Sequence, residues 1–405
     1  MDVMKKRWII LIDGFLVLLF MGISNAWSIF VVPLETTFNW TRSETSLAYT
    51  ICILFFSIGS ILAGSLSKNL SFRTILQIGA CLIGVGFFAS SKVTAVWQIY
   101  ITYSILVGTG IGMGYNVVLS VAPNWFMDRG GLATGVLMMG YALSTAIFGP
   151  TINSWIANIG ISSTFVRLAV ICAAGILITS ILQVIPTYEQ EVLLPKAVKK
   201  ANKGRNLFTT EMLKQPSFYL YFIFVIVAGG SGLCMINHLS PMISEGLKQS
   251  SAFAATIISV CSICNGISRL VWGTLSDKIS IDKILLTISC IFVGGFGLAF
   301  VAYSSGSVAL FVVAACVIYV AFGGNAACCP VFTRTMYGNR TFSLNYSVIS
   351  LNSLVSAFLP TIIGSLQAST GSYTMPIMVL LVATVVALVV CIVLGTFIRK
   401  EMKQA

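Results

Sequence analysis

Long apolar stretches recur along the whole chain, and short polar segments separate them. Twelve stretches are long enough to cross a hydrocarbon core, for which a helix needs about 20 residues. They cover residues 8–32, 45–66, 74–91, 97–121, 132–153, 165–185, 217–240, 253–275, 283–303, 307–331, 343–366 and 375–398. Backbone groups in lipid must find their hydrogen bonds within each segment, so these stretches are expected to be helices. The pattern predicts an all-α polytopic membrane protein with twelve transmembrane helices.

The longest polar stretch divides these spans into two sets of six. It covers residues 186–216 and is rich in lysine. We therefore expect a six-helix bundle over 1–185, a cytoplasmic linker over 186–216 and a second six-helix bundle over 217–405.

The two halves also resemble each other at matched positions. Four pairs of proline or glycine residues recur at offsets of 207–210 residues, namely Pro33 and Pro241, Gly64 and Gly273, Pro123 and Pro330, and Pro150 and Pro360. This regularity indicates a duplicated six-span unit, with two pseudo-symmetric bundles that rock about a midplane site and expose it alternately to each side.

Composition supports a lipid environment. Only 9% of the residues are charged and 57% are hydrophobic, with a mean hydropathy of +0.95. A soluble domain has about 25% charged residues, so lipid must be the solvent for much of this surface. The lipid bilayer is therefore an expected partner.

The net charge of +12 is explained by where the basic residues fall. If both termini lie in the cytoplasm, nineteen of the 24 lysines and arginines lie on the cytoplasmic side. The opposite loops hold only Arg42, Lys92, Arg167 and Lys248. This positive-inside asymmetry predicts a multi-pass protein of the plasma (bacterial inner) membrane with both termini cytoplasmic. Basic loops that meet anionic lipid headgroups account for the charge without nucleic acid.

Side chains for enzymatic or metal chemistry are sparse. All eleven cysteines fall within predicted spans, and the chain has one histidine. No HExxH motif or nucleotide-binding loop occurs, and the linker is too short for a catalytic domain. We expect no enzyme activity, no cofactor and no metal site.

One loop resembles the signature of a transporter superfamily. Gly273-Thr-Leu-Ser-Asp277-Lys278, after the eighth span, is similar to the Gly-x-x-x-Asp-Arg/Lys loop of major facilitator transporters. The resemblance implies the major facilitator fold and a conformational latch at Gly273, Asp277 and Lys278. The matching loop after the second span starts at Gly64 and departs from the pattern, because Lys68 replaces the acidic residue.

A closer resemblance extends over nearly the whole chain. It rests on Gly110-Ile-Gly-Met-Gly-Tyr115, on the segment from Asn124 to Gly135, and on Asn265-Gly-Ile-Ser-Arg269-Leu-Val-Trp-Gly273. These segments are similar to the oxalate–formate antiporter family, which is related to the monocarboxylate transporters. The resemblance implies a carrier of small carboxylate anions.

Arg269 is the most informative single residue because it lies within the eighth predicted span. A full charge at membrane depth costs at least about 2.5–3.5 kcal/mol, and arginine does not lose its proton to avoid that cost. The span contains no acidic residue before Asp277. A planar guanidinium suits a carboxylate, and the resemblance implies anion binding at this position. We expect Arg269 to bind the substrate; the alternative is that it snorkels to headgroups or pairs with Asp13.

Other polar and aromatic residues at membrane depth are weaker candidates, because inward-facing polar groups also serve helix packing. These substrate-binding candidates are Ser24 and Asn25 in the first span, Tyr115 and Asn116 in the fourth, Phe322 and Asn325 in the tenth, and Asn352 and Ser353 in the eleventh.

The charge of the cavity favours a monocarboxylate. The oxalate carrier of the resembling family has a lysine in the eleventh span, where this chain has Ser353 and no lysine or arginine from 341 to 398. One cation balances one carboxylate, so lactate, pyruvate or formate is favoured over oxalate. An oxalate–formate type dicarboxylate exchanger and a non-transporting carboxylate sensor on the same fold are the alternatives.

The coupling ion is open at this point. Asp13 in the first span and His238 near the end of the seventh are candidates for proton coupling. Both have structural alternatives, because Asp13 can face the cytoplasmic interface and a histidine at a helix end is often a structural donor. The expected partners are a small carboxylate substrate and either protons or a counter-anion, with a monomer as the functional form.

Overall fold

The computed structural model describes residues 2–195 and 206–403, and these residues form helices and no strands. Within them, eleven helical stretches are long and apolar enough to cross a membrane. One of the eleven, α7 (Gly130–Ser180), has 51 residues and turns at Gly160, where φ is 79°. That length is more than two crossings require, and the predicted spans 132–153 and 165–185 lie on either side of the turn. The all-helical fold is confirmed, whereas the count of twelve depends on dividing α7 at Gly160.

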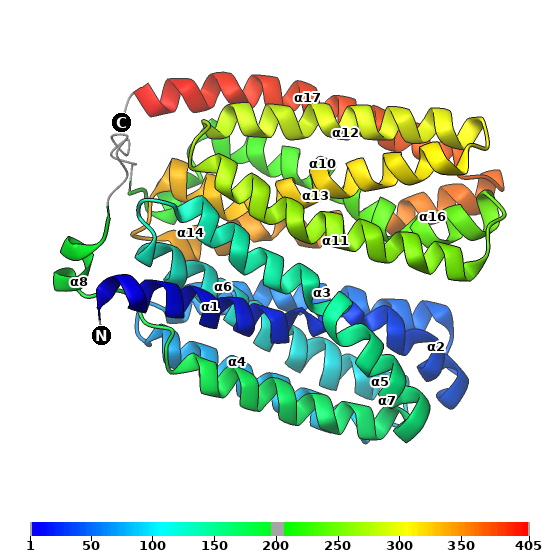
Figure 1. Ribbon diagram of the computed structural model, residues 1–405, viewed down its shortest axis with the longest axis horizontal. Coiled ribbons are helices and arrows are strands. Elements are labelled where there is room, and N and C mark those ends of the chain that lie inside the picture. The colour runs from blue at the N-terminus through cyan, green and yellow to red at the C-terminus, as the bar shows by residue number, and fades with distance from the viewer. Residues whose placement is uncertain (1, 196–205, 404–405) are drawn as a thin grey trace. The chain divides into compact units, whose positions relative to one another are not determined.

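The helices form two compact units (Figure 1). Unit 1 is Met1–Ala197 together with Ser343–Ser350, and unit 2 is Val198–Phe342 together with Leu351–Ala405. The predicted boundaries at 185 and 217 stay a prediction, and residues 196–205 of the predicted linker lie outside the described residues. The described parts of that linker hold the short helices α8 (Tyr188–Leu193) and α9 (Thr209–Met212).

Unit 1 begins with a first span that is broken at its centre. It consists of α1 (Val3–Met21), the 3-10 segment η1 (Gly22–Ala26) and α2 (Trp27–Phe38). The break coincides with the polar and small residues Gly22-Ile-Ser-Asn-Ala26. A side chain at position 22 would lie 2.6 Å from Ser144 Cβ and closer still to the Tyr141 carbonyl oxygen of α7. The glycine therefore lets the break pack against α7.

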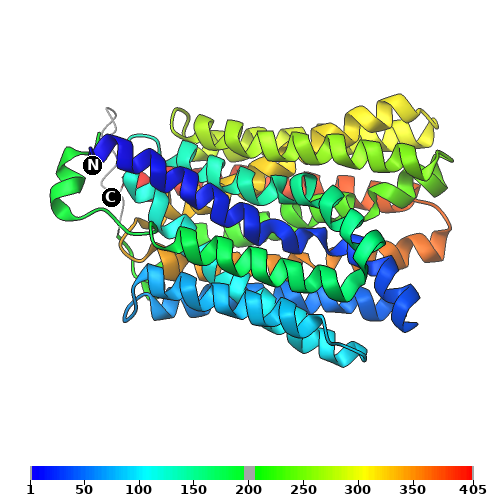
Figure 2. The ribbon, with the colours of Figure 1, turned by 60° about the horizontal axis from the view of Figure 1, so that its bottom comes forward.

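Of the remaining spans of unit 1, the second, the fourth and α7 contact this first span, and the third packs against the fourth and α7. The remaining spans are α3 (Arg42–Leu66), α4 (Phe72–Ser90), the fourth span formed by α5 (Val96–Ile99), η2 (Tyr100–Val107), α6 (Gly108–Val121) and η3 (Ala122–Trp125), and α7. Helix α1 lies between the two limbs of α7 that meet at Gly160 (Figures 1 and 2).

Unit 2 contains α10 (Pro216–Pro241), η4 (Met242–Gly246), α11 (Ser251–Ser276), α12 (Ile281–Ser304), α13 (Val308–Tyr337) and α17 (Thr374–Lys403). The eleventh predicted span is broken into α14 (Phe342–Ser350), α15 (Asn352–Ser356) and α16 (Leu359–Thr370). Pro360 lies at the start of α16, where its missing N–H leaves no helical bond unmade. Of these three helices, residues Ser343–Ser350 of α14 belong to unit 1.

Local geometry repeats between the halves at an offset of 209 residues. Ser67 Oγ donates to the Gly64 carbonyl at 2.8 Å, and Ser276 Oγ donates to the Gly273 carbonyl at 2.6 Å. The backbone bonds of the two loops also match, and both following helices start at a serine, Ser71 before α4 and Ser280 before α12. The loop conformation is thus the same in both halves although Lys68 stands where Asp277 does in the second.

Candidate functional site

Arg269 lies seven residues before the end of α11 in unit 2, and the residue is only 7% exposed. Its Nε donates to Asn265 Oδ1 at 3.3 Å, one helical turn earlier on the same face. The helix is well started, because the N-cap Ser250 accepts from the Phe253 N–H at 3.2 Å. The structure therefore holds a buried guanidinium at membrane depth and orients it with a neutral amide.

Close packing against α13 fixes the turn that carries this pair. A side chain at Gly323 of α13 would lie 2.6 Å from the Asn265 carbonyl oxygen and would also collide with Ser268 Oγ. Trp272 Nε1 donates to the Val320 carbonyl at 3.2 Å. Helices approach this closely only where one of them has no side chain. Glycine at 323 thus sets the position of the Asn265–Arg269 turn.

The tenth-span candidates face α10. Phe322 lies against Gly232, and Asn325 lies against Gly229. Asn325 is 3% exposed, and its Oδ1 has no hydrogen-bond partner among the described residues. A buried carboxamide oxygen without a donor is unfavourable by about 1–3 kcal/mol, which makes it a ready acceptor for a ligand hydroxyl. Asn352, buried, and Ser353, half-buried, lie on α15 of the same unit.

In unit 1, Ser24 lies on the break η1 inside a group of tyrosines. Tyr103 OH donates to the Ser24 carbonyl at 3.2 Å, and Ser24 Oγ is 3.5 Å from Tyr141 OH. The rings of Tyr115 and Tyr141 meet edge to face at 5.1 Å between centroids. The structure thus brings Ser24 and Tyr115 together through Tyr141, and Asn25 lies on the same break.

Sequence reasoning did not single out Tyr103 and Tyr141. A signal was present, because tyrosine is a rare polar group within otherwise apolar spans and buried phenols usually find a partner. The spans alone do not say which tyrosines share a face, because η2 is a π-helix that changes the register before α6.

Asn116 does not join this group. It is fully buried and its Nδ2 donates to Ser60 Oγ at 3.0 Å, to the Ser343 carbonyl at 3.0 Å and to Ser347 Oγ at 2.9 Å. Gly64 provides the room, since a side chain there would lie 2.7 Å from Ser347 Oγ. In this state the Asn116 amide holds the α14 residues of unit 1 against α3 and α6.

Asp13 is buried in α1, with 5% exposure. Gln183, which follows α7 and is fully buried, donates from Nε2 to Asp13 Oδ2 at 2.5 Å. Sequence patterns could not reveal this pair, because its members are 170 residues apart.

His238 has partners at both ring nitrogens. Nδ1 lies 3.2 Å from Tyr373 OH, and Nε2 lies 2.9 Å from the Pro360 carbonyl oxygen. A carbonyl oxygen only accepts, so Nε2 carries the proton and Nδ1 accepts from the tyrosine in the neutral ring. This geometry ties α10 to α16 and to the start of α17.

The loop after α11 has a buried Gly273 and exposed Asp277 and Lys278. The Asp277 N–H caps α11 by bonding to the Thr274 and Leu275 carbonyls. Its latch role stays a prediction.

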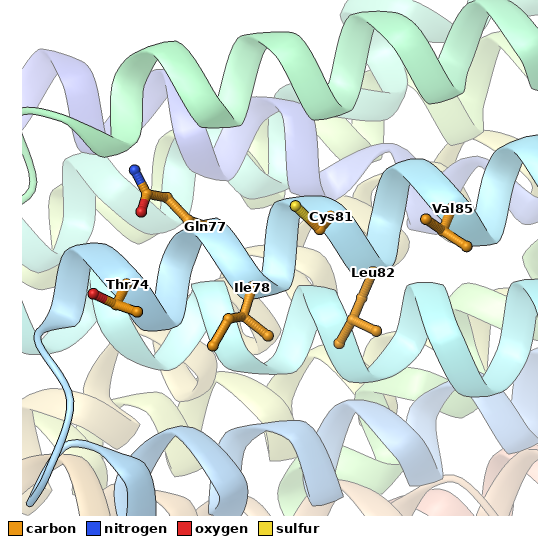
Figure 3. Close-up of a pocket in the computed structure, with 6 residues that line it drawn as sticks. All are labelled: Thr74, Gln77, Ile78, Cys81, Leu82 and Val85. Atoms are coloured by element: carbon orange, nitrogen blue, oxygen red, sulfur yellow. The ribbon is translucent and has the colours of Figure 1, made fainter.

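A groove of about 380 Å³ runs along α4 and is unrelated to these residues. It is lined by Thr74, Gln77, Ile78, Cys81, Leu82 and Val85, all from the same helix (Figure 3). A surface made by one face of one helix holds no convergent polar groups, so it lacks the character of a substrate site.

Relatives of the chain bear the names of carriers. It is 26% identical over 352 residues to the uncharacterized MFS-type transporter YhjX of Escherichia coli, covering 86% of this chain and 85% of that protein. It is 25% identical to the oxalate:formate antiporter of Oxalobacter formigenes, covering 84% and 80%. It is also 25% identical to human monocarboxylate transporter 12, covering 91% and 76%.

Solved structures agree on the fold. The proton:xylose symporter XylE aligns with a TM-score of 0.75 at 15% identity over 95% of both chains. The transporter FucP, in an outward conformation, aligns with a TM-score of 0.69 at 13% identity over 98% of this chain and 99% of its own.

The family model of the Major Facilitator Superfamily matches residues 14–340, from the first span to the end of the tenth. The expectation of a non-enzyme agrees with this at the level of the family, because the relatives named above are transporters. Repeated loops, a helical membrane fold and the match over most of the sequence lead to one conclusion: the chain belongs to the Major Facilitator Superfamily, with the oxalate–formate and monocarboxylate carriers among its relatives.

Proposed function

We propose that this protein is a secondary active transporter that moves small organic anions, most of all monocarboxylates such as lactate, pyruvate and formate, by alternating access. It acts as a monomer in the plasma membrane with both termini in the cytoplasm. The observation that carries the proposal is Arg269, a guanidinium that is 7% exposed within a membrane-spanning helix.

Arg269 has the chemistry of a carboxylate receptor. The guanidinium stays charged at every accessible pH and offers five N–H donors in a rigid fork. The bond from Nε to Asn265 orients the plane of the fork. In low-dielectric surroundings the attraction of an anion is much stronger than in water. The site therefore favours an anionic substrate over its neutral acid or amide.

The other candidates give the site its shape and secondary contacts. Asn325 Oδ1 would accept a hydrogen bond from a substrate hydroxyl such as that of lactate. Phe322 offers an apolar wall, and Asn352 and Ser353 add polar contacts from α15. In unit 1 we assign Ser24, Asn25 and Tyr115 to the substrate path. Asn116 reaches substrate only after its bonds to Ser343 and Ser347 break.

The relatives support the class of substrate. One is named an oxalate:formate antiporter and another a monocarboxylate transporter. The single arginine of the predicted cavity and the absence of lysine from 341 to 398 favour one carboxylate over two. Gly273, Asp277 and Lys278 are assigned to a conformational latch, and the coupling partner is a proton or a counter-anion.

Counterflow in liposomes tests the proposal. Purified protein is reconstituted with unlabelled lactate inside, and uptake of labelled lactate is measured with pyruvate, formate and oxalate as competitors. We expect saturable uptake that Arg269→Gln abolishes, because loss of a buried charge contact removes about 2–5 kcal/mol of binding. The matched control is Arg399→Gln, another arginine of unit 2, which is 61% exposed and pairs with Asp282.

The outcomes separate the alternatives. Strong exchange of oxalate and weak exchange of lactate would identify a dicarboxylate exchanger instead. Lactate binding without flux would identify a sensor on the same fold. Equal uptake by wild type and Arg269→Gln would contradict the assignment of Arg269.

A further inference from the structure

Asp13 is the one acidic residue of α1, and the described side chains around it are neutral. The residue is 5% exposed, and among the described residues its carboxyl accepts one hydrogen bond, from the Gln183 amide. An ionised carboxylate without a cation is strongly disfavoured in such a place. Unlike arginine, a carboxyl group can lose its charge by taking up a proton.

Charged and titratable side chains of the elements packed against α1 are few and engaged elsewhere. Helix α6 carries only Tyr115, and η1 and η3 carry none. Those of α7 are Tyr141, Arg167 and Cys172, and the basic residues of α1 are Lys5, Lys6 and Arg7. On α7, Tyr141 contacts Tyr115, Arg167 stacks on Trp155, and Cys172 points at the Phe20 carbonyl. On α1, Lys6 covers Trp125, Arg7 pairs with Asp128, and Lys5 is exposed.

The side-chain oxygen of Gln183 lacks a hydrogen-bond donor in the described part of the chain, which indicates that a proton is missing from the Asp13 carboxyl. Gln183 Oε1 is buried and has no hydrogen-bond donor among the described residues. A carboxylate has no proton to offer to that oxygen, whereas a carboxylic acid does. An acid and a carboxamide can exchange two hydrogen bonds in a ring, which would satisfy both ends of the Gln183 amide. The orphaned oxygen is thus accounted for when Asp13 is protonated.

We propose that Asp13 is the proton-binding site of the transporter and that Gln183 is its positioning residue. The inference rests on the proposed function, since a coupled proton needs a transported anion. A proton from the water on one side converts the carboxylate to the acid, and the same proton leaves to water on the other side. No other bond is made or broken.

The packing of α1 gives this proton a mechanical consequence. A side chain at Gly140 of α7 would lie 2.7 Å from the Phe15 carbonyl, so α1 and α7 are in backbone contact two residues from Asp13. Further along the same helix, the break η1 carries Ser24 beside Tyr141. The neutral acid form of Asp13 is compatible with this close contact between α1 and α7. The carboxylate form requires water, so the two helices must separate to admit it. Binding and release of the proton are thereby coupled to movement of α1, which leads to the substrate path.

Two transport assays on one set of liposomes test the inference. Lactate counterflow needs no net proton movement, whereas accumulation driven by a pH step does. For one proton per lactate, a step of about one pH unit corresponds to about tenfold accumulation. We expect wild type to show both activities and Asp13→Asn, which resembles the protonated acid, to retain counterflow but lose accumulation and lactate-driven proton uptake. Asp282→Asn, a buried acid of unit 2 that pairs with Arg399, is the control and keeps both.

A second variant guards against misfolding of Asp13→Asn. Gln183→Leu keeps the carboxyl and removes its partner, so we expect accumulation to persist with a shifted pH profile, which a merely structural role would not produce. Three results would each overturn the inference. The first is accumulation by Asp13→Asn equal to that of wild type, and the second is loss of both counterflow and accumulation in a folded Asp13→Asn. The third is an unshifted pH profile in Gln183→Leu. Wild type with counterflow and no accumulation would overturn it while leaving the proposed function intact, and wild type with neither would contradict the proposed function.

Discussion

Unit 1 buries Asp13 in α1 and holds it with the amide of Gln183, whereas unit 2 buries Arg269 in α11 and holds it with the amide of Asn265. Both side chains are less than 10% exposed at membrane depth. The two side chains differ in whether they can lose their charge. The acid can become neutral by binding a proton, and the guanidinium cannot. On the proposed assignments, a similar degree of burial favours a proton as the ligand of Asp13 and an anion as the ligand of Arg269.

The largest effect is expected from giving unit 2 an acid where it now has an amide. Asn265→Asp places a carboxylate beside Arg269, where it competes with the substrate for the guanidinium. We expect lactate counterflow at neutral pH to fall by about 30-fold or more, which corresponds to about 2–5 kcal/mol.

The control for this variant is Asn237→Asp, an exposed asparagine near the end of α10. It adds the same charge in solvent reach and should leave counterflow near the wild-type rate. A lower midpoint of thermal unfolding in Asn265→Asp than in wild type would indicate damage to packing instead of competition for Arg269.

The next largest effect concerns the stability contributed by an ion pair at the helix ends of each unit. Arg7 and Asp128 lie 2.9 Å apart in unit 1 with exposures of 4% and 16%. Asp282 and Arg399 lie 3.0 Å apart in unit 2 with exposures of 8% and 61%. Removing one partner of a buried pair costs about 3–5 kcal/mol, whereas a pair with one exposed member contributes about 0–1 kcal/mol.

Thermal unfolding in detergent measures this contrast. Asp128→Asn should lower the midpoint of unfolding clearly, because it leaves the buried Arg7 charge unpaired. Asp282→Asn should lower it little, because the Arg399 charge that it leaves is 61% exposed. Replacing Arg7 and Asp128 together by leucine should recover much of the loss, since the charge left without a partner, on Arg129, is 63% exposed. Equal shifts for Asp128→Asn and Asp282→Asn would mean that burial does not govern these pairs.

The smallest effect concerns the packing that positions Arg269. Gly323→Ala places a methyl group against Asn265 and Ser268 and should destabilise the protein by about 1–3 kcal/mol. Gly294→Ala in α12 meets nothing within 4 Å, so it should be neutral or slightly stabilising, because alanine favours helix. Lactate affinity is measured alongside unfolding. A Gly323→Ala protein with unchanged affinity would show that the position of the Asn265 turn does not matter for binding.

The fold followed from the sequence because lipid leaves few choices. Apolar length alone predicts the helices, and the offset of 209 residues between Gly64 and Gly273 reappears as matching loop hydrogen bonds. The interruptions were not foreseen. The break at Gly22–Ala26, the turn at Gly160 and the division of the eleventh span into three helices arise from tertiary contacts and local backbone angles that a hydropathy pattern does not contain.

The candidate site was predicted less completely. Arg269 is identifiable from the sequence because a charge in an apolar run is rare. Its orienting partner Asn265 lies one turn away and could have been inferred from helical spacing. Contacts over long separations could not, and the partners of Asn116 lie 227 and 231 residues further along the chain. The sequence therefore predicts Asn116 to be a ligand of the substrate, whereas in the structure it makes packing contacts.

We propose that Arg269 recognises the negative charge of the substrate. The most direct measurement is equilibrium binding of labelled lactate to the purified protein, with competition by unlabelled lactate and by lactamide, its neutral counterpart of nearly equal shape. We predict that wild type prefers lactate over lactamide by about 30-fold or more and that Arg269→Gln loses this preference. Equal binding of the two compounds by wild type, or an unchanged preference in Arg269→Gln, would contradict this role of Arg269.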